Sequence, residues 1–255
     1  MINIGIVGAE NSHTTAIAKV INVEKRVRGA RVTHVWGERP AYAQQAAWDG
    51  QIPHIVDRPT DLVGEVDAVV VDHRHARYHL PAARPLLEAK LPLFIDKPFC
   101  YRVAEGRKFL RRAVQLSVPV TSFSTLPFQR SFREFAKRAR RIGRLRQVVS
   151  SGSCDIGSPW GGIFFYGIHQ VDMALRLLGC DLSAAQLIRG TGRSHVGCLG
   201  FRGGEMACFN LLGEGEAKFH LSAIGMRGRV DQVIEFDESP YLTGIRAFVK
   251  MFRTG

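Results

Sequence analysis

Short runs of apolar residues, separated by segments with helical character, fill the first half of the chain. Ala68–Val71 contains only Ala and Val, and Leu93–Ile95 is equally apolar. A strand that is apolar on both faces must be buried on both, and a parallel sheet covered by helices provides this burial. The alternation therefore predicts a doubly wound α/β domain. The expected strands are 2–7, 32–36, 68–71, 93–95 and 118–121, with helices at about 12–22, 41–48, 78–90 and 103–116.

The pattern changes after about Arg144. Beyond a helix predicted at His169–Leu178, short strand-like runs are separated by loops, several of which contain glycine, and this is typical of an antiparallel sheet. A last amphipathic helix, Tyr241–Phe252, is expected to pack back. We therefore expect a first domain at 1–125 and a smaller α+β domain with an open antiparallel sheet at 126–255. Its expected strands are 185–188, 195–201, 206–212, 217–224 and 230–236.

Composition narrows the class of protein. No apolar run approaches the roughly 18 residues that span a bilayer, and Met1–Gly5 lacks the basic region and cleavage site of a signal peptide. The 5 cysteines are an odd number without CxxC spacing, so they indicate neither a disulfide framework nor a zinc site. The expected location is the cytoplasm.

The net charge of +12 is concentrated in one region. Residues 101–150 hold 13 Lys and Arg but only two acidic residues, Glu105 and Glu134. Phe128, Phe132 and Phe135 recur at helical spacing there, which predicts an amphipathic helix with a basic outer face. A solvated face is the favoured interpretation, and a surface for nucleic acid or another polyanion is the alternative.

The turn after the first strand reads Gly8-Ala9-Glu10-Asn11-Ser12-His13. A Rossmann turn uses glycines so that backbone N–H groups approach a pyrophosphate. Only the first glycine of GxGxxG is present, because Glu10 and His13 occupy the other two positions. Asn11 and Ser12 can cap the helix or add hydrogen bonds to a phosphate, so a cofactor site is still expected.

The end of the second strand carries the next cofactor signal. Gly37 stands where a ribose-binding acid is expected, and Glu38 and Arg39 follow it. Glu38 is suited to ribose hydroxyls and Arg39 to a 2′-phosphate, so NAD and NADP both stay open.

A run of polar residues, Asp72–His79, follows the strand 68–71. It is expected at the carboxyl edge of the sheet, where doubly wound sheets bind ligands. His73 and Arg74 are therefore candidates for contact with the cofactor or another anion, with a plain surface turn as the alternative. His75 and His79 have i,i+4 spacing but lack an acidic partner, so no metal site is predicted.

Two further motifs suggest acid/base chemistry. Lys97 lies in Phe94-Ile95-Asp96-Lys97-Pro98-Phe99, directly after an expected strand. His169 lies in Tyr166-Gly167-Ile168-His169, at the start of a predicted helix. A lysine and a histidine together suit proton transfer in carbonyl or alcohol chemistry.

Taken in order, these motifs resemble the glucose–fructose oxidoreductase / inositol dehydrogenase / MocA (Gfo/Idh/MocA) family. Asp96-Lys97-Pro98 resembles the family's Glu-Lys-Pro motif, and Gly8 to His13 is similar to a poorly characterised branch. The resemblance implies reversible hydride transfer between NAD(P) and a sugar, cyclitol or similar polyol. It implies a homodimer or homotetramer formed through the face of the second sheet.

The resemblance also implies roles for individual residues. Lys97 is expected to hydrogen-bond the reacting hydroxyl, His169 to be the general base, and Asp96 to lie beside the cofactor. Asp172, one turn after His169, either orients that ring or forms a salt bridge that stabilises the helix.

Three departures support a second hypothesis. Phe165 stands where the family often has an aspartate, the glycine turn is incomplete, and the sequence stops where relatives usually continue through another helix. A non-catalytic binding or sensing protein on the same fold is therefore the alternative to the oxidoreductase.

Overall fold

The computed structural model describes residues 1–215 and 217–254 and divides the chain into two compact units. The first comprises Met1–Phe123 and the segment that begins at Tyr241, and the second comprises Ser124–Pro240. The sequence-based boundary lay between residues 125 and 126, with the last helix assigned to the second domain. The structure counts this helix with the first unit because its apolar residues, such as Ile245 and Phe248, are buried in that unit's core. The two units are described separately.

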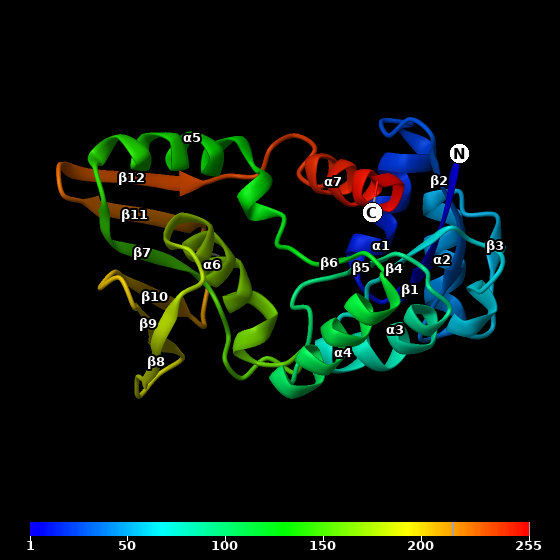
Figure 1. The fold of residues 1–255 in the computed structure, drawn as a ribbon, viewed down its shortest axis with the longest axis horizontal. Coiled ribbons are helices and arrows are strands. Elements are labelled where there is room, and N and C mark those ends of the chain that lie inside the picture. Colours follow the sequence, from blue (N-terminus) through cyan, green and yellow to red (C-terminus); the bar gives the residue numbers. More distant parts are fainter. Residues whose placement is uncertain (216, 255) are drawn as a thin grey trace. The chain divides into compact units, whose positions relative to one another are not determined.

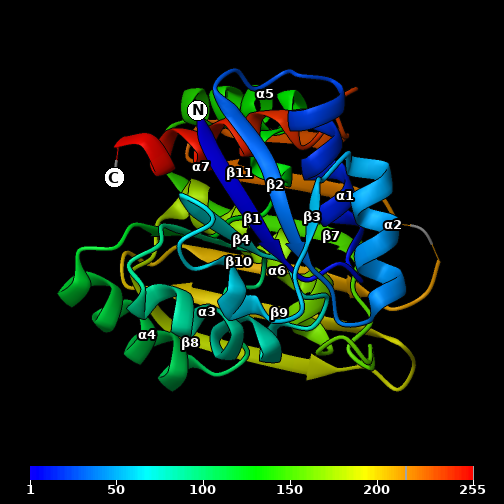
Figure 2. The ribbon, with the colours of Figure 1, turned by 90° about the vertical axis from the view of Figure 1, so that its right-hand side faces the viewer.

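The first unit contains a parallel sheet in the order β3-β2-β1-β4-β5-β6. Figure 2 shows β1, β2 and β3 side by side. The prediction of a doubly wound parallel sheet is confirmed, although the short exposed strand β3 was not predicted. The order reverses between β1 and β4, which makes the carboxyl ends of these strands the expected ligand edge. The bounds are β1 Ile2–Val7, β2 Ala30–Trp36, β3 His54–Ile55, β4 Ala68–Val71, β5 Leu93–Ile95 and β6 Val120–Thr121.

Helices cover both faces of this sheet (Figure 1). In β4, Val70 belongs to one apolar core, whereas Val69 and Val71 belong to another. Since alternate side chains of a strand point to opposite faces, these cores lie on opposite sides of the sheet. Helices α1, α2 and α7 contribute to the first core, and α3 and α4 to the second. The bounds are α1 Ser12–Ala18, which continues as a π-helical turn at Lys19–Val23, α2 Pro40–Gly50, α3 His79–Glu88, α4 Val103–Leu116 and α7 Leu242–Thr254.

The second unit contains a sheet in the order β12-β11-β7-β10-β9-β8 (Figure 1). Strand β10 pairs with β7 in parallel and the other pairs are antiparallel, so the sheet is mixed, whereas the sequence suggested an antiparallel one. The central strand β7 was not predicted because two of its buried positions, Ser150 and Gly152, are not hydrophobic. The bounds are β7 Leu145–Ser153, β8 Leu182–Arg189, β9 Ser194–Phe201, β10 Met206–Leu212, β11 Phe219–Gly225 and β12 Gly228–Ile234.

Helices α5 (Arg130–Ala139) and α6 (Ile163–Leu178) supply the other side of this unit's core. The amphipathic basic helix is confirmed, because Phe132 and Phe135 of α5 are buried. Helix α6 begins six residues earlier than predicted, directly after Gly162, whose φ is +61°. Within the described residues, every helix is too short or too polar to cross a lipid bilayer.

Candidate functional site

The turn between β1 and α1 requires glycine at its first position. Gly8 has a φ of +113°, and a Cβ built there would lie 2.7 Å from the carbonyl carbon of Asp72 and 2.8 Å from the backbone nitrogen of His73. The turn can therefore pass against the end of β4 only because this residue has no side chain. This contact brings the turn beside the polar residues that follow β4.

The backbone N–H groups of the turn hold a carboxylate from the same chain. Ala9 and Glu10 donate to Oε2 of Glu38, at 2.8 and 3.0 Å. The other oxygen, Oε1, is buried and has no hydrogen-bond partner among the described residues. Successive N–H groups that converge on one anion are the feature by which such turns bind phosphate. The turn therefore retains the capacity to bind an anion despite its missing glycines.

Five polar side chains from the turn and from the ends of β4 and β5 meet beneath it. Nδ2 of Asn11 donates to Asp72 at 2.7 Å and to Asp96 at 3.3 Å, while Oδ1 caps α1 by accepting from the backbone N–H of His13. Nδ1 of His13 lies 3.2 Å from Oδ2 of Asp96. The hydroxyl of Thr14 contacts Oδ2 of Asp72 at 2.6 Å. Neighbouring strands and the turn thus converge on one network, as expected for the switch point of a doubly wound sheet.

The two aspartates of this network differ in charge. Burial, followed by the charge of Asp96, raises the pKa of Asp72 well above its usual value. The hydrogen bonds agree, since the Thr14 hydroxyl also lies 2.8 Å from the Gly8 carbonyl and has a single hydrogen. The Thr14 hydroxyl can therefore donate either to Asp72 or to the Gly8 carbonyl, and in the second case a protonated Asp72 can donate to the Thr14 oxygen. The raised pKa thus favours the neutral form of Asp72.

Asp96 carries the negative charge. Burial opposes its ionisation, but the charge and hydrogen bond of His13 and the charge of Lys97 outweigh burial and lower the pKa of this carboxyl. An ionised Asp96 only accepts, so Nδ1 of His13 carries the proton of their hydrogen bond. Lys97 is itself buried, with 7% of its surface exposed. The site thus places a buried lysine next to one buried anion.

The same atoms resemble a metal site, which the sequence did not predict. One ligand atom each of His13, Asp72 and Asp96 lies within 4.8 Å of the others. A neutral Asp72 and the nearby charge of Lys97 both oppose a divalent cation there. We therefore assign these atoms to the hydrogen-bond network and derive no metal chemistry from them.

His79 fixes the loop that carries Lys97, a role that sequence reasoning missed. Its Nε2 lies 2.7 Å from the carbonyl of His73, and its Nδ1 lies 3.0 Å from the carbonyl of Pro98. The ring is completely buried. The sequence feature that could have indicated the burial of His79 is its position on the apolar face of α3, four residues before the buried Ala83. His79 joins the loop after β4 to the Lys97-Pro98 segment.

The remaining cofactor candidates of the first unit lie in different surroundings. His73 is buried 5.7 Å from the ring of Trp36, and burial together with the charge of His79 lowers the pKa of His73 to about 3. Arg74 is half-buried and Ser12 is exposed. Arg39 is exposed, and its guanidinium lies 5.6 Å from the ring centre of Tyr42.

In the second unit, His169 is positioned through a serine. Its Nδ1 lies 2.7 Å from Oγ of Ser124, and the backbone N–H of Ser124 donates to Asp172 at 2.9 Å. Asp172 also pairs with Arg176 at 3.0 Å, one turn further along α6. Asp172 therefore forms the salt bridge within α6 and also accepts a hydrogen bond from the backbone of Ser124, whose hydroxyl lies against His169. Ser124 was missed because it lies 45 residues before His169 in sequence.

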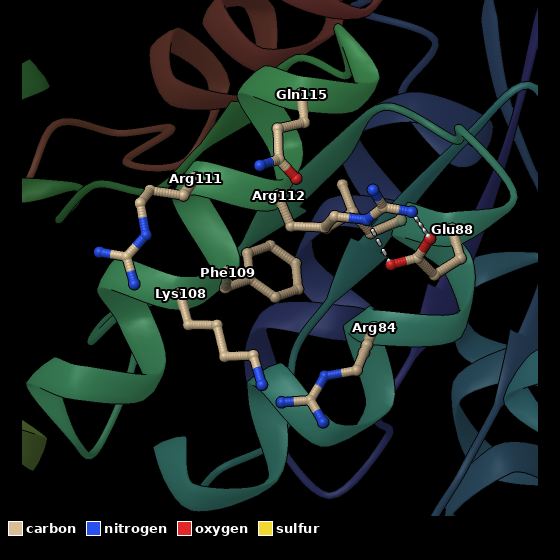
Figure 3. A pocket seen from close by; sticks show the side chains of 8 residues that line it. Arg84, Glu88, Lys108, Phe109, Arg111, Arg112 and Gln115 are labelled. Atoms are coloured by element: carbon tan, nitrogen blue, oxygen red, sulfur yellow. Dashed lines mark hydrogen bonds and ion pairs between the residues drawn. The ribbon is translucent and has the colours of Figure 1, made fainter.

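A basic hollow of about 460 Å³ lies between α3 and α4, and the predicted site residues are not among those that line it. Figure 3 shows Arg84 of α3 and Lys108 of α4 extending toward each other, and Arg112 reaching toward Glu88. Arg112 donates two hydrogen bonds to Glu88, at 2.9 and 2.6 Å. Part of the positive charge of residues 101–150 is thus neutralised locally on the outer surface of the first unit.

Comparison with known proteins identifies related sequences. Residues 2–123 match the GFO_IDH_MocA family model, described as an oxidoreductase family with an NAD-binding Rossmann fold. A curated relative, "Uncharacterized oxidoreductase YhhX" of Escherichia coli (strain K12), is 26% identical over 160 residues. This match covers 58% of the chain and 46% of the relative, so it spans less than half of that protein's length.

Solved structures show the same fold over nearly the whole chain. Scyllo-inositol dehydrogenase from Lactobacillus casei, with bound NAD(H) and scyllo-inositol, has a TM-score of 0.83 at 16% identity, covering 98% of this chain and 88% of that one. Myo-inositol 2-dehydrogenase from Lactobacillus plantarum has a TM-score of 0.83 at 15% identity, covering 99% and 89%. At these identities the likeness establishes the architecture alone.

Proposed function

We propose that this chain, whose residues 2–123 match the model of the Gfo/Idh/MocA oxidoreductase family, transfers a hydride between a nicotinamide cofactor and a polyol. The observation that carries the proposal is the buried Lys97 beside the ionised Asp96, at the carboxyl end of β5. A buried cation at this edge of a doubly wound sheet suits an oxygen that gains negative charge during reaction.

The turn and the end of β2 fit a dinucleotide. Ala9 and Glu10 have N–H groups directed at an anion, and Glu38 brings a carboxylate to the same place. A carboxylate there accepts hydrogen bonds from ribose hydroxyls and repels a 2′-phosphate. Arg39 lies over Tyr42. We therefore propose NAD as the preferred coenzyme, with a nicotinamide that accepts the hydride when bound.

Residues of this chain would accept the proton of the substrate hydroxyl and stabilise the charge on its oxygen. Lys97 would donate a hydrogen bond to the reacting hydroxyl oxygen and stabilise its developing charge. In the second unit, His169 would serve as a general base at Nε2, the ring nitrogen opposite its Ser124 contact. Asp172 would act through Ser124, because it holds the backbone of that residue. Asp96 would provide the negative charge beside Lys97.

The first test is binding. Purified full-length protein is titrated with NADH and with NADPH, followed by nucleotide fluorescence and thermal shift. A micromolar Kd for NADH corresponds to roughly 8 kcal/mol of binding free energy and supports the proposal. Absence of binding by either nucleotide, reduced or oxidised, refutes it.

The second test is turnover. Myo-inositol, scyllo-inositol and common sugars are screened with NAD, because two of the structurally similar proteins are inositol dehydrogenases. Wild type is compared with Lys97→Ala, His169→Asn and Ser124→Ala. Lys97→Ala and His169→Asn should lose turnover. Ser124→Ala should mainly lower kcat and change the pH profile of kcat. Equal activity in all four proteins removes the roles given to these residues.

A non-catalytic sensing function is the second candidate. Phe165 replaces a frequent family aspartate, and Glu10 replaces a turn glycine. Nucleotide binding without hydride transfer on any polyol favours this alternative, whereas a measurable rate excludes it.

We also propose a homodimer or homotetramer and a cytoplasmic location. The support for assembly is the outer face of the second unit's sheet, where Ile188, Val196 and Met206 are 53%, 37% and 46% exposed. Apolar side chains grouped on one sheet face favour a partner subunit. Sedimentation equilibrium of the purified protein tests this, and a monomer at micromolar concentration contradicts it.

A further inference from the structure

Two cysteines face each other across neighbouring strands of the second unit. Cys198 on β9 and Cys208 on β10 are direct register partners, and their sulfur atoms lie 3.6 Å apart. Both side chains are half-buried. Ala207 and Phe209, the neighbours of Cys208, are buried in the core, so the two thiols lie on the outer face of the sheet, the face proposed above for subunit contact. The sequence separation of ten residues gave no sign of this pair.

The backbone geometry suits a covalent bond between these sulfurs. Directly opposed residues of antiparallel strands have Cα atoms about 4.5 to 5.5 Å apart. Disulfides occur at Cα separations of about 4.4 to 6.8 Å, so either kind of cross-strand pair falls within this range. The sulfurs must approach by about 1.5 Å to reach a bonding distance near 2.05 Å. Small side-chain rotations provide this movement without a change in strand register.

We infer that Cys198 and Cys208 form a reversible dithiol–disulfide pair that exchanges with a low-molecular-weight disulfide such as oxidised glutathione. One cysteine thiolate attacks a sulfur of glutathione disulfide and releases one glutathione as the thiolate. The second cysteine thiolate then attacks the protein sulfur of the mixed disulfide and releases the other glutathione. The two cysteines lose two electrons and two protons, and one glutathione disulfide becomes two glutathione thiols.

The other three cysteines provide contrasts. Cys154 is buried, Cys100 is half-buried in the first unit, and Cys180 is exposed. Within the part of the chain that the structure describes, no second sulfur contact of this kind occurs. Cys180 therefore reports whether the oxidant reaches an accessible thiol, while the pair reports whether a second thiol resolves the adduct.

The reaction conditions follow from the environment of the pair. Burial, together with the hydrogen bond and charge of Cys208, raises the pKa of the Cys198 thiol. Since the thiolate is the attacking species, exchange should be slow at neutral pH and faster at pH 8.5. The reaction is therefore followed over several hours at both values.

The experiment incubates the folded full-length protein with oxidised glutathione and then blocks remaining thiols with maleimide in denaturant. Wild type should lose two reactive thiols together and yield a peptide pair joined through Cys198 and Cys208, and dithiothreitol should reverse this. Cys198→Ser and Cys208→Ser should each retain one glutathione at the remaining partner. The control Cys180→Ser should cross-link like wild type.

The inference fails if Cys180 becomes glutathionylated while Cys198 and Cys208 both stay reduced. It fails equally if these two residues carry separate adducts without a cross-link. Circular dichroism of each variant shows whether it is folded, and Cys198→Ala and Cys208→Ala replace any serine variant that is not. If subunit contacts shield the two thiols from glutathione, the cross-link forms only at protein concentrations low enough for the oligomer to dissociate. The reaction is therefore repeated at such a concentration, and absence of the cross-link there also overturns the inference.

Discussion

The substitution Asp72→Asn tests the charge assignment at the centre of the site. Asp72 is completely buried, its pKa is raised, and its carboxyl oxygens lie within hydrogen-bond distance of the Thr14 hydroxyl and the Asn11 amide, so we treat it as a neutral acid. Asparagine has nearly the same shape and supplies one donor and one acceptor at the same places. At pH 4 or below, the free energy of unfolding should therefore change by no more than about 1 kcal/mol, the contribution of one ordinary hydrogen bond.

The effect should depend on pH with a definite sign. The folded-state pKa of Asp72 is raised above the unfolded value of 3.8, so its contribution to stability is present below that value and is lost as pH rises through the folded pKa. Asparagine does not titrate and avoids this loss. The stability of Asp72→Asn relative to wild type should thus rise above pH 4, by at most about 1.4 kcal/mol per pH unit.

Urea unfolding between pH 4 and pH 8 measures this difference. A Trp160→Phe background leaves Trp36 and Trp48, both in the first unit, as fluorescence probes. Asp96→Asn is the matched comparison. It removes an ionised carboxylate that serves His13 and Lys97, and it should cost about 3 kcal/mol near pH 7. This cost should shrink as pH falls, because a lowered pKa gives stability that is lost in acid.

Two results would refute the assignment. One is a relative stability of Asp72→Asn that falls as pH rises from 4 to 8. The other is a loss at pH 7 as large as that of Asp96→Asn. Either result would mean that Asp72, and not Asp96, carries the buried charge.

Three further predictions concern the same unit. Lys97→Ala should lower kcat by about 10²–10⁴-fold while the Kd for NADH and the fold stay close to wild type; retained turnover in a steady-state assay rejects its role. Glu38→Ser should improve the Kd for NADPH relative to NADH by about tenfold, or about 1.4 kcal/mol, because a repelling carboxylate is removed; an unchanged ratio of the two dissociation constants argues against Glu38 as the selecting residue. Gly8→Ala should lower the free energy of unfolding by more than about 2 kcal/mol, since its Cβ would meet the backbone of Asp72 at 2.7 Å. The control Gly204→Ala also has a positive φ but meets nothing within 4 Å, so it should cost only about 1 kcal/mol; equal urea midpoints for the two variants contradict the steric argument.

The sequence by itself determined the elements whose burial is visible in local periodicity. Ala68–Val71 and Leu93–Ile95 were predicted with their observed bounds, because strands buried on both faces are continuously apolar. Helix Val103–Leu116 was also predicted with its observed bounds. The motifs around Lys97 and His169 suggested the family. The family model matches residues 2–123, which include Lys97, while the His169 motif lies outside the match. Strand β7 was not predicted from the sequence, because serine and glycine occupy two of its buried positions.

Only the tertiary structure decided which side chains meet. The carboxylate of Glu38 lies on the turn at Ala9, Asp72 and Asp96 share the amide of Asn11, and Cys198 faces Cys208. The partners of the first two contacts are 29 to 85 residues apart in the sequence. Periodicity records how each segment buries its own face, whereas these contacts depend on strand order and register across the sheet. Charge states follow from the same packing. Burial and neighbouring charges, which no local pattern shows, raise the pKa of Asp72 and lower that of Asp96, so they favour a neutral Asp72 and an ionised Asp96.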